Sequence, residues 1–254
     1  MPAVLSDARL GRATPAAGPG VCRLCHGPAL PGHRWCWCCR RVTEALGSHP
    51  AWAPAVVPVA LCRPGDTLHS ALRRYKDAPA VAARAHYAGL LGRRLDAFVR
   101  AHGRCVAAHG PWDTLAVVPS SSRVGRHGRY GAWPVEALVA RAGSLRGQAL
   151  LSMERGPGSA CHLAPAPDAF VASGDVAGRR VLVVEDTWVT GARAMSAVTA
   201  LRTAGAEVMA VLVLGRCVDP SASARHAHWW SAHDMGDERR CCLEPHAPGA
   251  PVER

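Results

Sequence analysis

The segment Val181–Arg193 (VLVVEDTWVTGAR) has the clearest pattern of a ligand-binding site in the sequence. It contains two adjacent acids followed by a turn with threonine and glycine. Four apolar residues precede Glu185 and Asp186, which predicts a buried strand that delivers both carboxylates to the ligand-binding edge of a parallel sheet. The N–H groups of the following helix attract phosphate, and Gly191 lets the backbone approach an anion closely. A ribose 5-phosphate carrying pyrophosphate fits these groups, with its hydroxyls on the acids and a magnesium ion nearby.

This segment resembles the signature with which type I phosphoribosyltransferases bind 5-phosphoribosyl 1-pyrophosphate (PRPP): four apolar residues, two acids, then a Thr/Gly-rich turn. The resemblance implies that Glu185 and Asp186 hold the ribose hydroxyls and that the turn cradles the 5-phosphate. The residues of that turn are Thr187, Trp188, Val189, Thr190, Gly191, Ala192 and Arg193.

The sequence departs from the family pattern at two positions of the turn. Val189 stands where the family usually has a second hydroxyl residue or an acid, and Arg193 stands where it usually has Thr or Ser. Val189 has no side-chain hydrogen-bonding group, while Arg193 could bind phosphate or point into solvent. Because purine-salvage members use an acid at the Val189 position, we do not expect a purine-salvage role.

Two cysteine pairs near the N-terminus have the spacing of a metal site. Two residues separate Cys22 from Cys25, and two separate Cys36 from Cys39. Four thiolates on two tight turns match tetrahedral zinc. Since we recognise no secretion signal, metal binding explains the cysteines better than disulfides do, and we expect a cytoplasmic protein with a structural zinc ion.

Three alternatives for the cysteines stay open from the sequence. Cys38 could replace Cys39 as a ligand. The run Trp35–Cys39 also looks like the Trp-Cys-x-x-Cys of thioredoxin-like proteins, although redox chemistry there needs a preceding strand that we do not expect. The tail offers three further ligands, namely Cys241, Cys242 and His246.

A zinc ribbon ahead of such a domain resembles the ComF family, which is linked to competence and DNA uptake or repair. The likeness runs through the cysteine pairs, the region of Lys76 and the segment up to Gly215. It implies that Lys76 lies near the pyrophosphate loop and that Arg126 belongs to a basic loop. We expect these two charges to stabilise the leaving pyrophosphate while phosphoribose passes to an unidentified nitrogen acceptor.

The alternative function is a non-catalytic, ComF-like accessory protein that binds single-stranded DNA or DNA-processing proteins. The formal net charge of +11 favours anionic partners, but the basic residues are scattered rather than clustered. Lys76 is the only lysine in an arginine-rich sequence, either by chance or because arginine cannot replace it. Proteins of this fold are often dimers, so a homodimer is a further expectation.

The pattern of elements around these residues favours an α/β fold with a parallel sheet flanked by helices. Apolar runs predict strands at 115–118, 149–153, 170–172, 181–184 and 208–214, and a strand or an ordered linker at 55–61. Helical spacing predicts helices at 40–46, 67–75, 79–99, 133–140, 192–204 and 222–231. Gly103 is expected to stop the third of these helices.

The organisation along the chain follows from these elements. We expect a disordered leader over 1–20, a zinc-ribbon module over 21–47, a phosphoribosyltransferase-like domain over 55–235 and a Cys- and Pro-containing tail over 236–254. No apolar run is long enough to span a membrane.

Overall fold

The computed structural model describes residues 10–120, 134–233 and 241–243. The chain forms an α/β fold around a six-stranded sheet with the strand order β1-β6-β5-β2-β3-β4. The strands are β1 (Ala55–Cys62), β2 (Thr114–Val117), β3 (Ala149–Arg155), β4 (Phe170–Ser173), β5 (Arg180–Trp188) and β6 (Glu207–Cys217). All neighbouring strands pair in parallel except β3 and β4, which are antiparallel. The expected fold class is confirmed.

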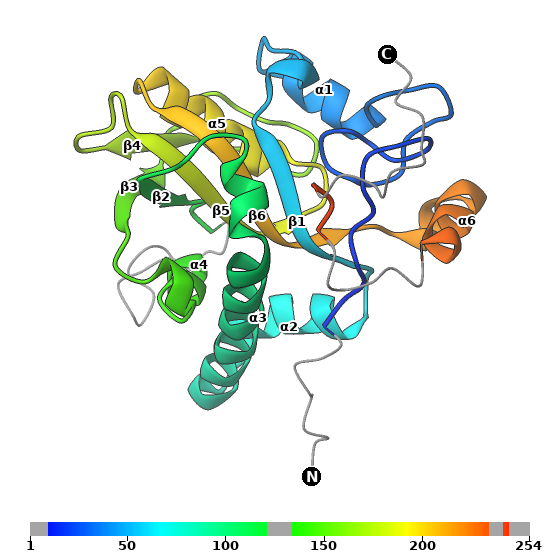
Figure 1. The fold of residues 1–254 in the computed structure, drawn as a ribbon, viewed down its shortest axis with the longest axis horizontal. Coiled ribbons are helices and arrows are strands. Elements are labelled where there is room, and N and C mark those ends of the chain that lie inside the picture. The colour runs from blue at the N-terminus through cyan, green and yellow to red at the C-terminus, as the bar shows by residue number, and fades with distance from the viewer. Residues whose placement is uncertain (1–9, 121–133, 234–240, 244–254) are drawn as a thin grey trace.

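Helices cover both faces of this sheet (Figure 1). They are α1 (Trp37–Ala45), α2 (Thr67–Asp77), α3 (Val81–Ala107), α4 (Pro134–Val139), α5 (Ala192–Thr203) and α6 (Ala224–Ala232). One core joins α2, α3 and α4 to one face, and the other core joins α5 and the cysteine module to the opposite face. None of the helices in the described ranges has the length and apolar character of a membrane span.

The central strand β5 contributes to both cores because its side chains alternate between the faces. Leu182 and Val184 belong to the core under α2 and α3, whereas Val181 and Val183 belong to the core under α5. Residues 181–184 carry no polar side chain and are buried on both sides, as expected for the interior of a parallel sheet.

The part of the expected leader that the structure describes is ordered, contrary to the prediction. Leu10 is 1% exposed, and Arg12 forms an antiparallel bridge with Leu61 of β1. The guanidinium of Arg12 donates to the carbonyl oxygen of Trp230 at 3.0 Å and lies 4.1 Å from the centroid of its ring. This segment therefore joins β1 to α6, an interaction between distant residues that local composition does not reveal.

Two further elements differ from their predicted extents. Helix α3 continues through Gly103 to Ala107, because a stripe of buried side chains on this helix, including Val106, packs against the sheet beyond the glycine. Strand β5 continues to Trp188, so the acid pair lies within the strand rather than after it. The predicted strand at Ala55 is present, and the linker alternative is wrong.

Candidate functional site

The carboxyl end of β5 carries the two acids, both of them nearly inaccessible to solvent. Glu185 is 6% exposed and Asp186 is 2% exposed. Alternation along the strand directs Asp186 to the face of α2 and directs Glu185 to the face of α5. The two side chains therefore lie on opposite faces of the sheet at the same edge.

Asp186 is held by two consecutive residues of α2. The hydroxyl of Tyr75 donates to Oδ2 of Asp186, and Nζ of Lys76 forms an ion pair with the same oxygen. Burial alone raises the pKa of Asp186, but the charge of Lys76 and these hydrogen bonds outweigh it, so the pKa is lowered. Burial lowers the pKa of Lys76, yet the charge of Asp186 prevails and raises it. Both groups are therefore charged at neutral pH.

Among the described residues, no ion pair like that of Lys76 with Asp186 is found for Glu185, although the charges of Arg193 and Lys76 act on its carboxylate. Its Oε1 accepts a weak hydrogen bond from the N–H of Asp186 at 3.3 Å. Its Oε2 is buried and has no hydrogen-bond partner among the described residues. Burial and the negative charge of Asp186 raise the pKa of Glu185 to about 8. This oxygen is therefore available to a ligand hydroxyl or a cation.

The turn between β5 and α5 requires a glycine at its last position. Gly191 has a φ of 87° and precedes the first residue of α5, and it has no side chain with which to cap the helix. A Cβ at this position would also overlap the indole ring of Trp188. Trp188 is 1% exposed, so its side chain belongs to the core beneath the turn and only its backbone is available to a ligand.

A cavity of about 110 Å³ opens at this turn. It is much smaller than the about 300–1,000 Å³ of typical ligand pockets, so it suits a single phosphate-sized group. The N–H groups of the first turn of α5, which have no partner within the helix, favour an anion there. The lining residues are Cys161, His162, Thr187, Trp188, Val189, Thr190, Gly191, Ala192, Arg193 and Ala194.

The remaining residues of the turn have distinct environments. The hydroxyl of Thr190 donates to the carbonyl oxygen of His162 and accepts from the N–H of Ala192 at 3.4 Å. Val189 is 42% exposed, as suits a residue that contributes only its backbone. Arg193 neither extends into solvent nor lies free, because its guanidinium donates to the carbonyl oxygen of Pro119 and packs over Phe170. Pro119 follows the end of β2, and Phe170 begins β4.

Not every predicted site residue falls within the described part of the chain. Arg126 lies outside the described residues, as does His246. The described residues do join Lys76 to Asp186 although 110 positions separate them in the sequence. The sequence had suggested a role at the site for Lys76 but none for Tyr75.

The four cysteines of the predicted zinc ribbon converge in one buried group. The ligand atoms of Cys22, Cys25, Cys36 and Cys39 all lie within 4.8 Å of one another. The sulfurs of Cys25 and Cys36 are 3.7 Å apart, close to the roughly 3.8 Å edge of a tetrahedron of sulfurs about 2.3 Å from zinc. This donor set fits zinc, and Cys38, which is only partly buried, is not part of it.

Arg216 connects the cysteine group to the turn after β5, and the sequence reasoning missed it. It is 5% exposed and donates from Nη1 to the carbonyl oxygen of Val189 at 3.0 Å. Burial lowers the pKa of Arg216, but the negative charge of Cys25 and its neighbours raises it overall. The available signal was a charged residue within the apolar run of β6, which demands a buried partner.

Comparison with known proteins adds a partial sequence similarity. No family model matches the chain. An 84-residue stretch is 39% identical to the orotate phosphoribosyltransferase of Streptomyces avermitilis, covering 33% of this chain and 44% of that protein. The orotate phosphoribosyltransferase of Streptomyces coelicolor has the same identity and coverage. The chain thus spans less than half the length of these relatives.

Solved structures align more weakly. A phosphoribosyltransferase from Corynebacterium diphtheriae has 22% identity and a TM-score of 0.33, over 58% of this chain and 82% of its own. The orotate phosphoribosyltransferase of Mycobacterium tuberculosis H37Rv in complex with PRPP has 19% identity and a TM-score of 0.33, over 59% of this chain and 84% of its own. The sequence similarity supports a relation to the type I phosphoribosyltransferases.

Proposed function

We propose that the chain binds PRPP at the carboxyl end of β5 and transfers its phosphoribosyl group to a nitrogen acceptor. One arrangement carries this proposal: two buried acids lie next in sequence to a turn that lines a phosphate-sized cavity at the N-terminus of α5. The partial similarity to orotate phosphoribosyltransferases points to the same ligand.

In this proposal the backbone of the turn Thr187–Arg193 binds the 5-phosphate. Its anion-binding groups are the N–H groups at the start of α5, and Gly191 allows close approach. Thr190 keeps the turn in shape through its bond to His162. The buried side chain of Trp188 supports the turn from the core, and the guanidinium of Arg193 joins it to the carbonyl oxygen of Pro119 after β2.

The acids and Lys76 act on the ribose and the pyrophosphate. Ribose hydroxyls donate to Oε2 of Glu185 and to the carboxylate of Asp186. At Asp186 the hydroxyls compete with Lys76 for the carboxylate. The charge of Lys76 is thereby released toward the leaving pyrophosphate as the bond to C1′ breaks. Because catalysis then depends on positioning and charge stabilisation, no side chain has to serve as nucleophile. Arg126 is the second cation proposed for the pyrophosphate.

The residues present also fit a magnesium ion, which prefers carboxylate and phosphate oxygens. The buried Oε2 of Glu185 has no hydrogen-bond partner among the described residues and offers one such oxygen. When bound with PRPP, magnesium would neutralise the pyrophosphate charge and so aid its departure.

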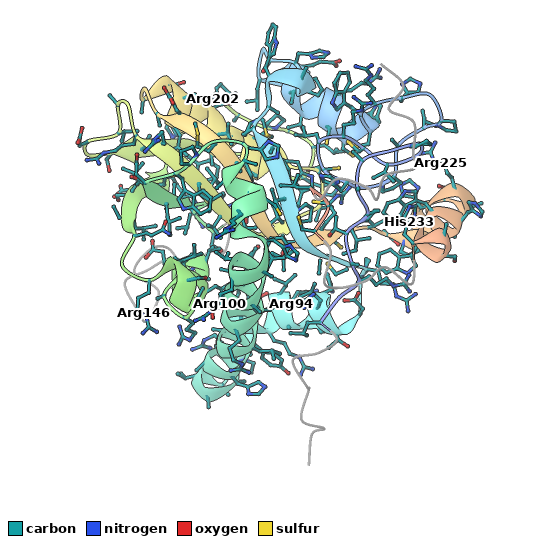
Figure 2. The ribbon with its side chains drawn as sticks, in the orientation of Figure 1. Arg94, Arg100, Arg146, Arg202, Arg225 and His233 are labelled. Carbon is teal, nitrogen blue, oxygen red and sulfur yellow. The ribbon has the colours of Figure 1, made fainter. Side chains whose placement is uncertain are left out.

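A nucleic-acid role has less support from the arrangement of charge. Figure 2 shows Arg94 and Arg100 along α3, Arg146 near α4, Arg202 on α5 and Arg225 on α6. These cations belong to separate parts of the molecule instead of forming the continuous basic face that nucleic-acid binding favours.

Titration calorimetry of PRPP and magnesium into the zinc-loaded protein tests the proposal. We expect saturable binding by the wild type and at least tenfold weaker binding by Glu185→Gln and by Glu185→Ala, Asp186→Ala. Glu207→Gln changes an exposed acid at the first residue of β6, away from the carboxyl end of the sheet, and should bind PRPP like the wild type. A folded wild type that does not bind PRPP would exclude the proposed function.

The acceptor is identified by release of pyrophosphate in the presence of single nitrogen bases. Orotate is the first to test, because the relatives bear its name. PRPP binding without turnover on any base would leave a PRPP-binding protein and contradict the transferase part of the proposal.

A further inference from the structure

A second group of metal-binding side chains lies away from the zinc ribbon. His102 and Cys105 come from the last turns of α3, and Cys241 comes from the C-terminal segment. Their ligand atoms all lie within 4.8 Å of one another. His102 is 4% exposed, Cys241 is 5% exposed and Cys105 is partly buried.

This group occupies the opposite side of the sheet from the zinc ribbon. Cys241 and Cys242 pack into the core beneath α2, α3 and α4, whereas Cys22 and its three partners pack into the core beneath α5. The tail cysteines therefore do not complete the first metal site, which was one of the alternatives open from the sequence. Cys241 lies instead beside the imidazole of His102 and the thiol of Cys105.

The local geometry explains how α3 presents two of these ligands together. Residues three apart on a helix lie on the same face, so His102 and Cys105 point in one direction. Gly103 stands between them at a position that favours the end of a helix, yet α3 continues to Ala107. An ion shared by His102 and Cys105 would stabilise this turn and offset the cost of the glycine.

The C-terminal segment supplies an independent observation. The described residues Cys241, Cys242 and Leu243 are packed against the core of α3, with Leu243 partly buried. This packing fixes the thiol of Cys241 beside α3, far along the chain from His102 and Cys105. A metal–thiolate bond from Cys241 would add to this anchorage, because binding of a structural metal contributes directly to folding.

We propose that His102, Cys105 and Cys241 form a second zinc site that fastens the C-terminal segment to α3. One imidazole and two thiolates are the donor types that zinc prefers, and the ion completes a tetrahedron with water or with the adjacent Cys242. The site is structural and does not depend on the function proposed above.

Zinc stoichiometry of the purified full chain, measured by mass spectrometry after exhaustive dialysis, tests this site. We expect two zinc ions per wild-type chain and one in Cys241→Ser and in His102→Ala. Cys161→Ser removes an exposed cysteine outside both groups and should retain two ions. Cys105→His should also retain two ions, because an imidazole can replace the thiolate as a zinc ligand. A role of Cys105 in packing alone would not be restored by the larger histidine side chain.

Cobalt substitution provides a second readout that does not depend on stability. The first site has four sulfur ligands and the second has two, so Cys241→Ser should remove part of the sulfur-to-cobalt absorption while the spectrum of the first site persists. That persistence also shows that the variant is folded. One zinc per wild-type chain, equal zinc in Cys241→Ser and wild type, or a Cys105–Cys241 disulfide in peptide mapping would each overturn the proposal.

Discussion

Arg216 donates a hydrogen bond from Nη1 to the carbonyl oxygen of Val189 at 3.0 Å, and the same guanidinium lies in the field of the Cys25 sulfur. One buried cation thus contacts the cysteine group and the proposed phosphate turn. Gly27 leaves room for it, since a side chain at that position would collide with the guanidinium. The cysteine group is therefore packed against the sheet whose strand carries the proposed site.

Replacing this cation should strongly destabilise the protein. Arg216→Met keeps much of the apolar stem but leaves the thiolates uncompensated and the carbonyl of Val189 without its donor. Removing one partner of a buried charged group costs about 3–5 kcal/mol. Urea denaturation should show that loss in the free energy of unfolding. Arg225→Met, at an exposed position on α6, should stay within about 0.5 kcal/mol of the wild type; equal losses would remove the special role of Arg216.

Gly191→Ala separates steric overlap from backbone strain. Gly178 has a φ of 73° with open space around it, so Gly178→Ala should cost about 1–2 kcal/mol from the left-handed backbone alone. At Gly191 the Cβ also meets the Trp188 ring, and overpacking adds about 1–3 kcal/mol. Denaturation of the two variants side by side measures the difference. Similar losses would mean that the indole moves aside without cost.

The Lys76–Asp186 pair should stabilise the fold above acid pH. The pKa of Asp186 is lowered in the folded protein, so its contribution is present above the unfolded pKa of about 4 and is lost as pH falls through the folded value. Lys76→Met should therefore cost about 2–3 kcal/mol at pH 7, given the partial exposure of Lys76, and less below pH 4. Tyr75→Phe is the matched variant that removes one hydrogen bond and keeps the ion pair. A pH-independent loss in Lys76→Met would contradict the pairing.

Glu185 should make the fold less stable as pH rises. Its pKa is raised from 4.5 to about 8 in the folded state, so between these values the folded protein binds more protons than the unfolded chain. Stability then decreases across that interval and levels off above it. Glu185→Gln should show a smaller decrease, so its advantage in melting temperature over the wild type should grow from pH 5 to pH 8. If the advantage of Glu185→Gln in melting temperature decreased as pH rises, the pKa of Glu185 would be lowered in the folded state and not raised.

Removing zinc from the ribbon should loosen the proposed phosphate turn. Without the charged cysteine group, Arg216 loses its main electrostatic partner and holds Val189 less firmly. Hydrogen exchange after chelation should become faster for the amides of the cysteine module and for those of Val189–Arg193. Amides in the middle of α2 serve as the internal reference, and unchanged exchange in the turn would show that the two regions are independent.

Local pattern was enough to locate the principal elements of the site. The apolar run before Glu185 predicted β5, and the glycine after the threonines predicted the start of α5. The cysteine spacing predicted the buried group that the structure contains. These features depend on residues close together in the sequence, whose periodicity and turn chemistry are readable directly.

Contacts between distant residues were not predictable in the same way. The Tyr75 hydroxyl reaches Asp186 across 111 positions, and nothing near either residue specifies that meeting. The antiparallel pairing of β3 with β4 and the continuation of α3 past Gly103 likewise depend on packing partners elsewhere in the chain. Tertiary packing overrides local propensity in such cases.

The ordered segment before the zinc ribbon has a consequence for self-association. Strand β1 lies at the border of the sheet, and such a strand offers unpaired backbone groups to other molecules. The backbone of Arg12 pairs with the N–H and carbonyl groups of Leu61, and the hydroxyl of Thr14 donates to the carbonyl oxygen of Pro58. Pro58 itself has no N–H group to pair. The chain thereby shields its own open strand from strand addition by a neighbour, and shortening it to begin at Val21 would uncover a surface prone to aggregation.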